Sequence, residues 1–240
     1  MTASPYPKAA AFLLGLLLLA PSLSAQLIVA NNAGFYTSAG DHDSSNTLYI
    51  TGASGLEVRS FFVFNLPVFT QPIISAKLEI YNNAAGEPWF IPGYLSGDAT
   101  ETLSLFKVST PVLTLLADAS GAVSIFNDLG NDPTSYGSRS VSSADDGSYV
   151  TFNALSAAFL SDLNAASGNA FAIGASITSI SDATGFESIF SASDLTSANP
   201  AVRLTLVPSA AAVPEPTTYG LVGVALLGFL MLRRRAVVQR

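Results

Sequence analysis

The sequence predicts a mainly β protein, an antiparallel and jelly-roll-like β-sandwich with one or two short helices. Apolar and polar residues alternate with a period of two in several short runs. Clusters of Gly, Asn, Asp and Pro separate these runs, as expected for the turns of an antiparallel sheet. The two ends of the chain are different, and an apolar helix is expected at each of them.

Six runs have the strand pattern. In residues 76–80, Ala76, Leu78 and Ile80 alternate with polar or larger residues, so one face of this strand should be buried. The run 58–64 is apolar at successive positions, which predicts a strand covered on both faces. The remaining strand candidates are residues 103–108, 149–152, 171–177 and 202–206.

One segment has helical spacing, with apolar residues at every fourth position, Leu155, Phe159 and Leu163. We expect a helix of two to three turns there, with Asn153 as its N-cap and Gly168 as its stop. A shorter helical turn is expected over residues 124–129, ended by Gly130.

The N-terminus has the pattern of a secretory signal peptide. Lys8 precedes the apolar run 9–20, and small residues follow it up to Ala25. We predict a signal peptide over residues 1–25 that is cleaved after Ala25. The alternatives are a buried core helix or an uncleaved anchor, although a run of this length is short for a bilayer.

The C-terminus has three parts in a fixed order, which together form residues 213–240. The motif 213–216 reads Val-Pro-Glu-Pro, an apolar segment at 217–232 is the predicted transmembrane helix, and a basic tail follows at 233–240. Arginines favour the cytoplasmic side of a membrane, so the rest of the chain should face outward. The alternative is a plain single-pass anchor on a proline-rich stalk.

This order resembles the PEP-CTERM sorting signal of exported bacterial proteins, a label that overlaps with the "ice-binding protein C-terminal" domain. The resemblance implies recognition and cleavage near Pro-Glu-Pro by an exosortase in the cytoplasmic membrane of a Gram-negative bacterium. The residues that carry it are Val213, Pro214, Glu215, Pro216, Arg233, Arg234 and Arg235.

Residues 26–212 are predicted to form one extracytoplasmic domain. They hold five basic and sixteen acidic side chains, a net charge of −11, which argues against nucleic-acid binding. The chain has no Cys, so disulfides and thiolate metal sites are excluded. The block 34–66 resembles the N-terminal part of an ectodomain common in PEP-CTERM proteins, a likeness that extends over most of residues 31–207 and implies no particular activity.

Acidic turns are the candidate metal ligands. Calcium takes six to eight oxygen ligands, which carboxylates in turns can supply. Asp and Asn also favour turns for their own backbone reasons, so plain surface turns are the alternative. The candidates are Asp41, Asp43, Asp128, Asp132, Asp145 and Asp146. We expect no cofactor, with a structural calcium ion as the one option.

Two aromatic residues, Trp89 and Tyr94, are the candidate ligand-binding residues. They stand in the segment 87–94, where an exposed ring could stack on a sugar. The alternative from the same sequence is a loop or lid that covers the core.

The function expected is that of a non-enzymatic cell-surface or matrix protein. It should pass through the inner membrane, stay there as an anchored precursor, and reach the cell surface or the extracellular space. The expected partners are an exosortase, the cytoplasmic membrane and exopolysaccharide. Alternatives are a lectin-like carbohydrate-binding module, an extracellular hydrolase, or an antifreeze protein, although no Thr-x-Thr ladder is present.

Overall fold

The computed structural model describes residues 24–84, 93–181, 186–210 and 223. Within them, Ser24–Ser209 form one compact unit. The predicted signal peptide lies outside the described residues except for Ser24 and Ala25, and the sorting segment lies outside them except for Gly223. The predicted boundaries at residues 25 and 212 stay predictions.

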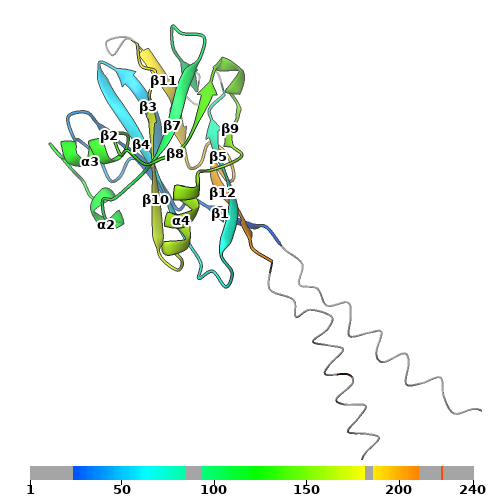
Figure 1. Ribbon diagram of the computed structural model, residues 1–240. Coiled ribbons are helices and arrows are strands. Elements are labelled where there is room, and N and C mark those ends of the chain that lie inside the picture. Colours follow the sequence, from blue (N-terminus) through cyan, green and yellow to red (C-terminus); the bar gives the residue numbers. More distant parts are fainter. Residues whose placement is uncertain (1–23, 85–92, 182–185, 211–222, 224–240) are drawn as a thin grey trace, which may run out of the picture. The chain divides into compact units, whose positions relative to one another are not determined.

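The described chain is mainly β, and its strands pair antiparallel in two sheets, as predicted (Figure 1). The four-stranded sheet has the order β1 (Gln26–Val29), β12 (Val202–Pro208), β5 (Ile73–Asn82) and β9 (Ser148–Phe152). The eight-stranded sheet has the order β6 (Tyr94–Leu95), β11 (Phe186–Asp194), β3 (Leu48–Ser54), β4 (Leu56–Asn65), β10 (Ala170–Ile177), β7 (Glu101–Lys107) and β8 (Ser135–Val141), and β2 (Asn32–Thr37) pairs with β4. The jelly-roll connectivity stays a prediction.

The inner faces of the two sheets share one core. The period-two alternation explains this, because every second side chain of a strand points to the same face. Each sheet contributes to the same cluster of buried side chains, among them Leu78, Ile80, Val202 and Leu204 from one sheet and Tyr49, Phe62, Phe64 and Ile173 from the other.

Strand β4 is buried on both faces, as its apolar run predicts. Phe62 and Phe64 point into the shared core, whereas Phe61 and Val63 point into a second cluster on the opposite side. Two short helices, α2 (Val112–Leu115) and α3 (Val123–Asp128), cover that side (Figure 1). The predicted turn over 124–129 is therefore confirmed, and it serves as the lid of this second cluster.

The longest described helix is α4 (Ala157–Ala165), which buries Phe159 and Leu163 in the shared core. The prediction of Asn153 as its N-cap was wrong. Ser156 is the N-cap, and its side chain accepts a hydrogen bond from the Phe159 backbone N–H at 3.2 Å. Leu155 is buried but precedes the helix, so the four-residue spacing extended the predicted helix by one apolar position. A 3₁₀ turn, η2 (Ser143–Asp145), completes the helical elements described.

Candidate functional site

Val213, Pro214, Glu215, Pro216 and Arg233–Arg235 lie outside the described residues. What the structure describes is the place where the domain ends. The Ser209 backbone N–H donates to the Pro72 carbonyl at 2.7 Å, so the chain is held to the domain up to that residue. Only three residues, 210–212, then separate Ser209 from the motif.

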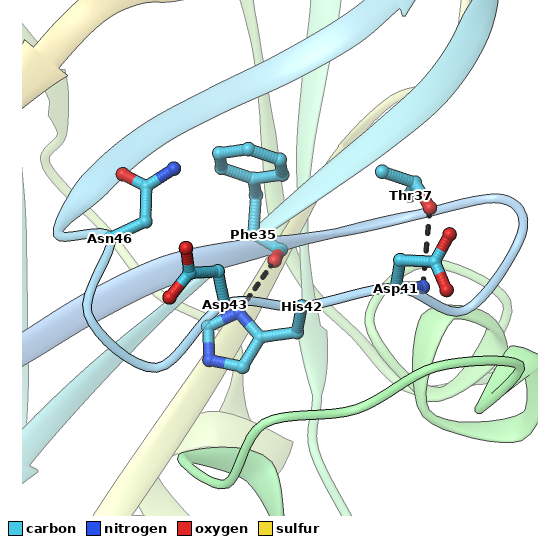
Figure 2. Close-up of a pocket in the computed structure, with 6 residues that line it drawn as sticks. All are labelled: Phe35, Thr37, Asp41, His42, Asp43 and Asn46. Atoms are coloured by element: carbon cyan, nitrogen blue, oxygen red, sulfur yellow. Dashed lines mark hydrogen bonds between the residues drawn. The ribbon is translucent and has the colours of Figure 1, made fainter.

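A shallow pocket lies at the end of β2 and in the loop that follows it (Figure 2). Its volume is about 260 Å³. The residues that line it are Phe35, Thr37, Asp41, His42, Asp43 and Asn46. It thus contains two of the carboxylates predicted as metal ligands and the only histidine of the chain.

The carboxylates of Asp41 and Asp43 do not converge. Figure 2 shows them on opposite sides of His42. Asp41 accepts hydrogen bonds from the Ser120 hydroxyl at 2.9 Å and the Gly121 N–H at 3.2 Å. Asp43 accepts from the N–H and the hydroxyl of Ser45, and these bonds lower the pKa of Asp43 below its usual value. Each carboxylate stabilises a turn, which is the alternative that the sequence left open.

His42 is held by its surroundings. Its Nδ1 lies 2.9 Å from the Phe35 carbonyl oxygen, and because a carbonyl only accepts, Nδ1 carries the proton. The imidazole stacks on Tyr36 at 4.7 Å between ring centroids and meets Phe61 edge-on at 5.4 Å. A Cβ at Gly34 would lie 2.6 Å from Phe61 Cζ and 3.0 Å from the imidazole Cε1, so a side chain there would displace the rings. His42 therefore attaches the loop to the aromatic cluster under α2 and α3.

Asp128 and Asp132 also have their oxygens engaged by the protein. Asp128 Oδ2 accepts from the backbone N–H groups of Ser109 and Thr110 and from the Thr110 hydroxyl, at 2.7–2.9 Å. Asp132 Oδ1 accepts from the Thr134 N–H at 2.6 Å. Both residues thus fix the backbone of loops, and the structure does not bring them together with the other predicted ligands.

Asp145 and Asp146 are neighbours with opposite environments. Asp145 pairs with Arg139 and also accepts from the Ser142 N–H, which completes a capping box on η2. Asp146 Oδ1 accepts from Asn82 Nδ2 at 2.9 Å and from the Tyr94 N–H at 2.7 Å. Burial raises the pKa of the Asp146 carboxyl above its usual value, and the negative charge of Asp145 adds to this effect.

We predict that these two neighbours respond in opposite directions to the same substitution. Asp146→Asn should stabilise the protein at pH 7 by on the order of 0.5 kcal/mol, because the amide oxygen can accept the two bonds on Oδ1 while a partly buried charge is removed. Asp145→Asn should destabilise it by about 0.5–2 kcal/mol, because the capping box and the Arg139 pair are weakened. Chemical denaturation of the wild type and both variants measures the difference.

The pH dependence of the stability gain from Asp146→Asn provides a control for this prediction. A raised folded-state pKa means that the carboxylate of Asp146 weakens the fold increasingly as the pH rises through that pKa. The advantage of Asp146→Asn should therefore shrink as the pH falls toward the ordinary pKa of Asp, about 3.9. A gain at pH 7 that persists unchanged at pH 3.5 would show that burial of the charge is not its cause.

The structure places the candidate Tyr94 in the core. Its side chain is buried, and its hydroxyl donates to the Asp98 carbonyl at 2.7 Å. This burial in the core cluster favours the alternative that the sequence left open, and a ligand-binding role of Tyr94 stays a prediction. Trp89 lies outside the described residues, and its predicted role stays a prediction.

A different acidic group is brought together by the fold. Carboxylate oxygens of Asp98, Glu101 and Glu187 all lie within 4.8 Å of one another, and Glu101 and Glu187 are only 1% and 4% exposed. Hydroxyls of Ser96 and Ser179 donate to Glu101, and Ser181 donates to Glu187. Among the described residues, these three carboxylates form the group that could hold a cation such as calcium. Sequence reasoning missed them because 86 residues separate Glu101 from Glu187.

The comparisons with known proteins identify the C-terminal motif. The family model of the PEP-CTERM protein-sorting motif matches residues 212–235. A search of curated proteins found no match to the chain. The fold and this motif together define an exported protein with a mainly β domain. The chain thus carries a PEP-CTERM protein-sorting motif at residues 212–235, which supports a protein that is exported and sorted by an exosortase.

The predicted transmembrane helix at 217–232 lies outside the described residues, apart from Gly223. Within the part of the chain that the structure describes, no helix is both long enough and apolar enough to cross a membrane.

Proposed function

We propose that this PEP-CTERM protein is cut at Val213–Pro216 by an exosortase and then acts outside the cell as a non-enzymatic matrix protein. The observation that carries the proposal is the sorting motif itself, which matches over residues 212–235. Residues 1–25 serve as the signal peptide for export, and residues 217–232 anchor the precursor in the cytoplasmic membrane.

The two prolines of the motif support cleavage there. We expect Pro214 and Pro216 to disfavour a helix at the motif and to favour an extended, accessible segment, because proline lacks an N–H and disfavours the helical conformation of the residue before it.

The role after cleavage is association with exopolysaccharide. The domain has a net charge of −11 and a surface rich in Ser, Thr, Asn and Gly, a composition suited to a hydrated matrix. A second candidate is a calcium-dependent lectin. The observation in its favour is the group Asp98, Glu101 and Glu187, since calcium prefers oxygen ligands and two of these three carboxylates are buried.

Binding of the full-length protein, purified in detergent, to the producer's own exopolysaccharide tests the proposal. We expect saturable binding that is the same in calcium and in EDTA. Loss of binding in EDTA would favour the calcium-dependent lectin, and Glu101→Gln should then reproduce the effect of EDTA. No binding in either buffer would overturn the matrix role, and release of reducing sugars from the polysaccharide would replace it with a hydrolase.

A further inference from the structure

The outer faces of the two sheets differ in what covers them. The outer side of β2, β4 and β10 is closed by α2 and α3 through a cluster of buried side chains. No such cluster covers the outer face of the four-stranded sheet within the described residues, where Leu27 on the edge strand β1 is 54% exposed and Lys77 in β5 is 39% exposed. This face of the described domain is therefore open to solvent.

The open face also differs from the rest of the domain in charge. The charged residues in its four strands are Lys77, Glu79 and Arg203, which sum to +1. The rest of residues 26–212 holds three basic and fifteen acidic side chains, a net charge of −12. An anionic polymer would be repelled by most of this domain but not by this face.

These charges are held in a fixed arrangement. Glu79 accepts from Arg203 Nε at 2.9 Å and Nη2 at 3.1 Å, and Lys77 Nζ lies 2.9 Å from the same carboxylate. The bonds from Arg203 hold the pKa of Glu79 below its usual value. The Glu79 carboxylate thus pairs with both Lys77 and Arg203, and the net charge of the three side chains is +1.

Aromatic side chains complete the arrangement. The Arg203 guanidinium lies over the Tyr149 ring, 4.1 Å from its centroid, and Tyr149 meets Tyr81 edge-on at 5.5 Å. The Tyr149 hydroxyl donates to the Pro200 carbonyl at 2.7 Å, which fixes the ring. The guanidinium is therefore held between the Tyr149 ring and the Glu79 carboxylate, which pre-organises it for a planar carboxylate.

We propose that this open face, defined by Lys77, Glu79, Tyr81, Tyr149 and Arg203, binds an anionic polysaccharide that carries uronate carboxylates. Lys77 and the N–H groups of Arg203 that do not donate to Glu79 contact the carboxylates, while the exposed parts of the two tyrosines pack against the sugar rings. Arg203 and both tyrosines lie partly buried along the sheet, which suits an extended chain better than insertion into a lipid surface. The inference rests on the proposed function and names the surface by which it operates.

Polygalacturonate is the probe, with dextran as the neutral polymer and vesicles of anionic phospholipid as the alternative surface. We expect the full-length protein in detergent to bind polygalacturonate with an affinity that falls as the salt concentration rises. We expect no binding to dextran. Binding to the vesicles is measured with the protein exchanged into amphipol. Lys77→Gln should weaken polygalacturonate binding about two- to fivefold, the effect of one exposed ion pair, and Lys77→Arg should retain it.

Lys107→Gln is the matched control. Lys107 is also 39% exposed, also lies on a strand, and also pairs with a carboxylate, Asp162 at 3.2 Å. Equal effects of the two Lys→Gln variants would overturn the proposal, as would tighter binding to the vesicles than to polygalacturonate. If the wild type binds the producer's exopolysaccharide but not polygalacturonate, this inference fails while the proposed function stands. If it binds neither, both fail.

Discussion

Replacing both Pro214 and Pro216 by alanine is expected to leave the full-length precursor in the cytoplasmic membrane. Alanine is the best helix former, so the predicted helix at 217–232 could extend backward through the motif. A helical motif would present its peptide bonds in intrahelical hydrogen bonds and not as an extended segment. We expect processing to slow by at least about tenfold, which corresponds to about 1.4 kcal/mol of lost recognition.

Pulse-chase labelling with fractionation of membranes and medium measures this effect. Pro133→Ala is the control, because Pro133 is an exposed proline in a loop of the folded domain. The control should be processed like the wild type. Unchanged release of the double variant, with the same new C-terminus by mass spectrometry, would refute cleavage directed by the motif.

Truncating either of two adjacent phenylalanines, Phe61 or Phe62, is expected to lower the free energy of unfolding by about 3–5 kcal/mol. In an ordinary half-exposed strand only one of two neighbours faces a core, so only one of the two variants would be strongly destabilised. Here Phe62 packs edge-on against Tyr49 in the shared core, with 5.4 Å between the ring centroids. Phe61 packs near Tyr36 in the cluster under α2 and α3, with 6.2 Å between the ring centroids.

Urea denaturation of Phe61→Ala and Phe62→Ala tests this expectation, with Phe186→Ala as the control. Phe186 begins β11 and is 64% exposed, so its loss should change stability by no more than about 0.5 kcal/mol. A small effect at Phe61 alone would mean that α2 and α3 do not hold the second cluster closed.

The strands were predictable because their information is local. Alternation in 76–80 and the doubly apolar run in 58–64 each reflect which faces are buried, and β5 and β4 confirm both. The cap of α4 was missed because Leu155 shares the apolar spacing of the helix without belonging to it. Spacing alone does not mark where the backbone turns, whereas Ser156 does so through one hydrogen bond.

The candidate site was less predictable. Asp residues were chosen for their chemistry, but the fold uses Asp41, Asp128 and Asp145 to bind backbone N–H groups of nearby or distant loops. Tyr94 was chosen as an exposed ring and is buried. In each case the sequence shows which chemical groups are present. Only the packing of the folded chain decides whether these groups remain available to a ligand.

By itself the sequence determined that this protein carries an export-associated sorting motif, because such a motif is read along the chain and needs no distant residue. It also determined a mainly β domain, since side-chain alternation is a local property. Only the tertiary structure decided which charges meet. Glu79 and Arg203 are 124 residues apart, yet they lie opposite each other in β5 and β12. Such pairs depend on strand register, and register is set by the packing of the whole core.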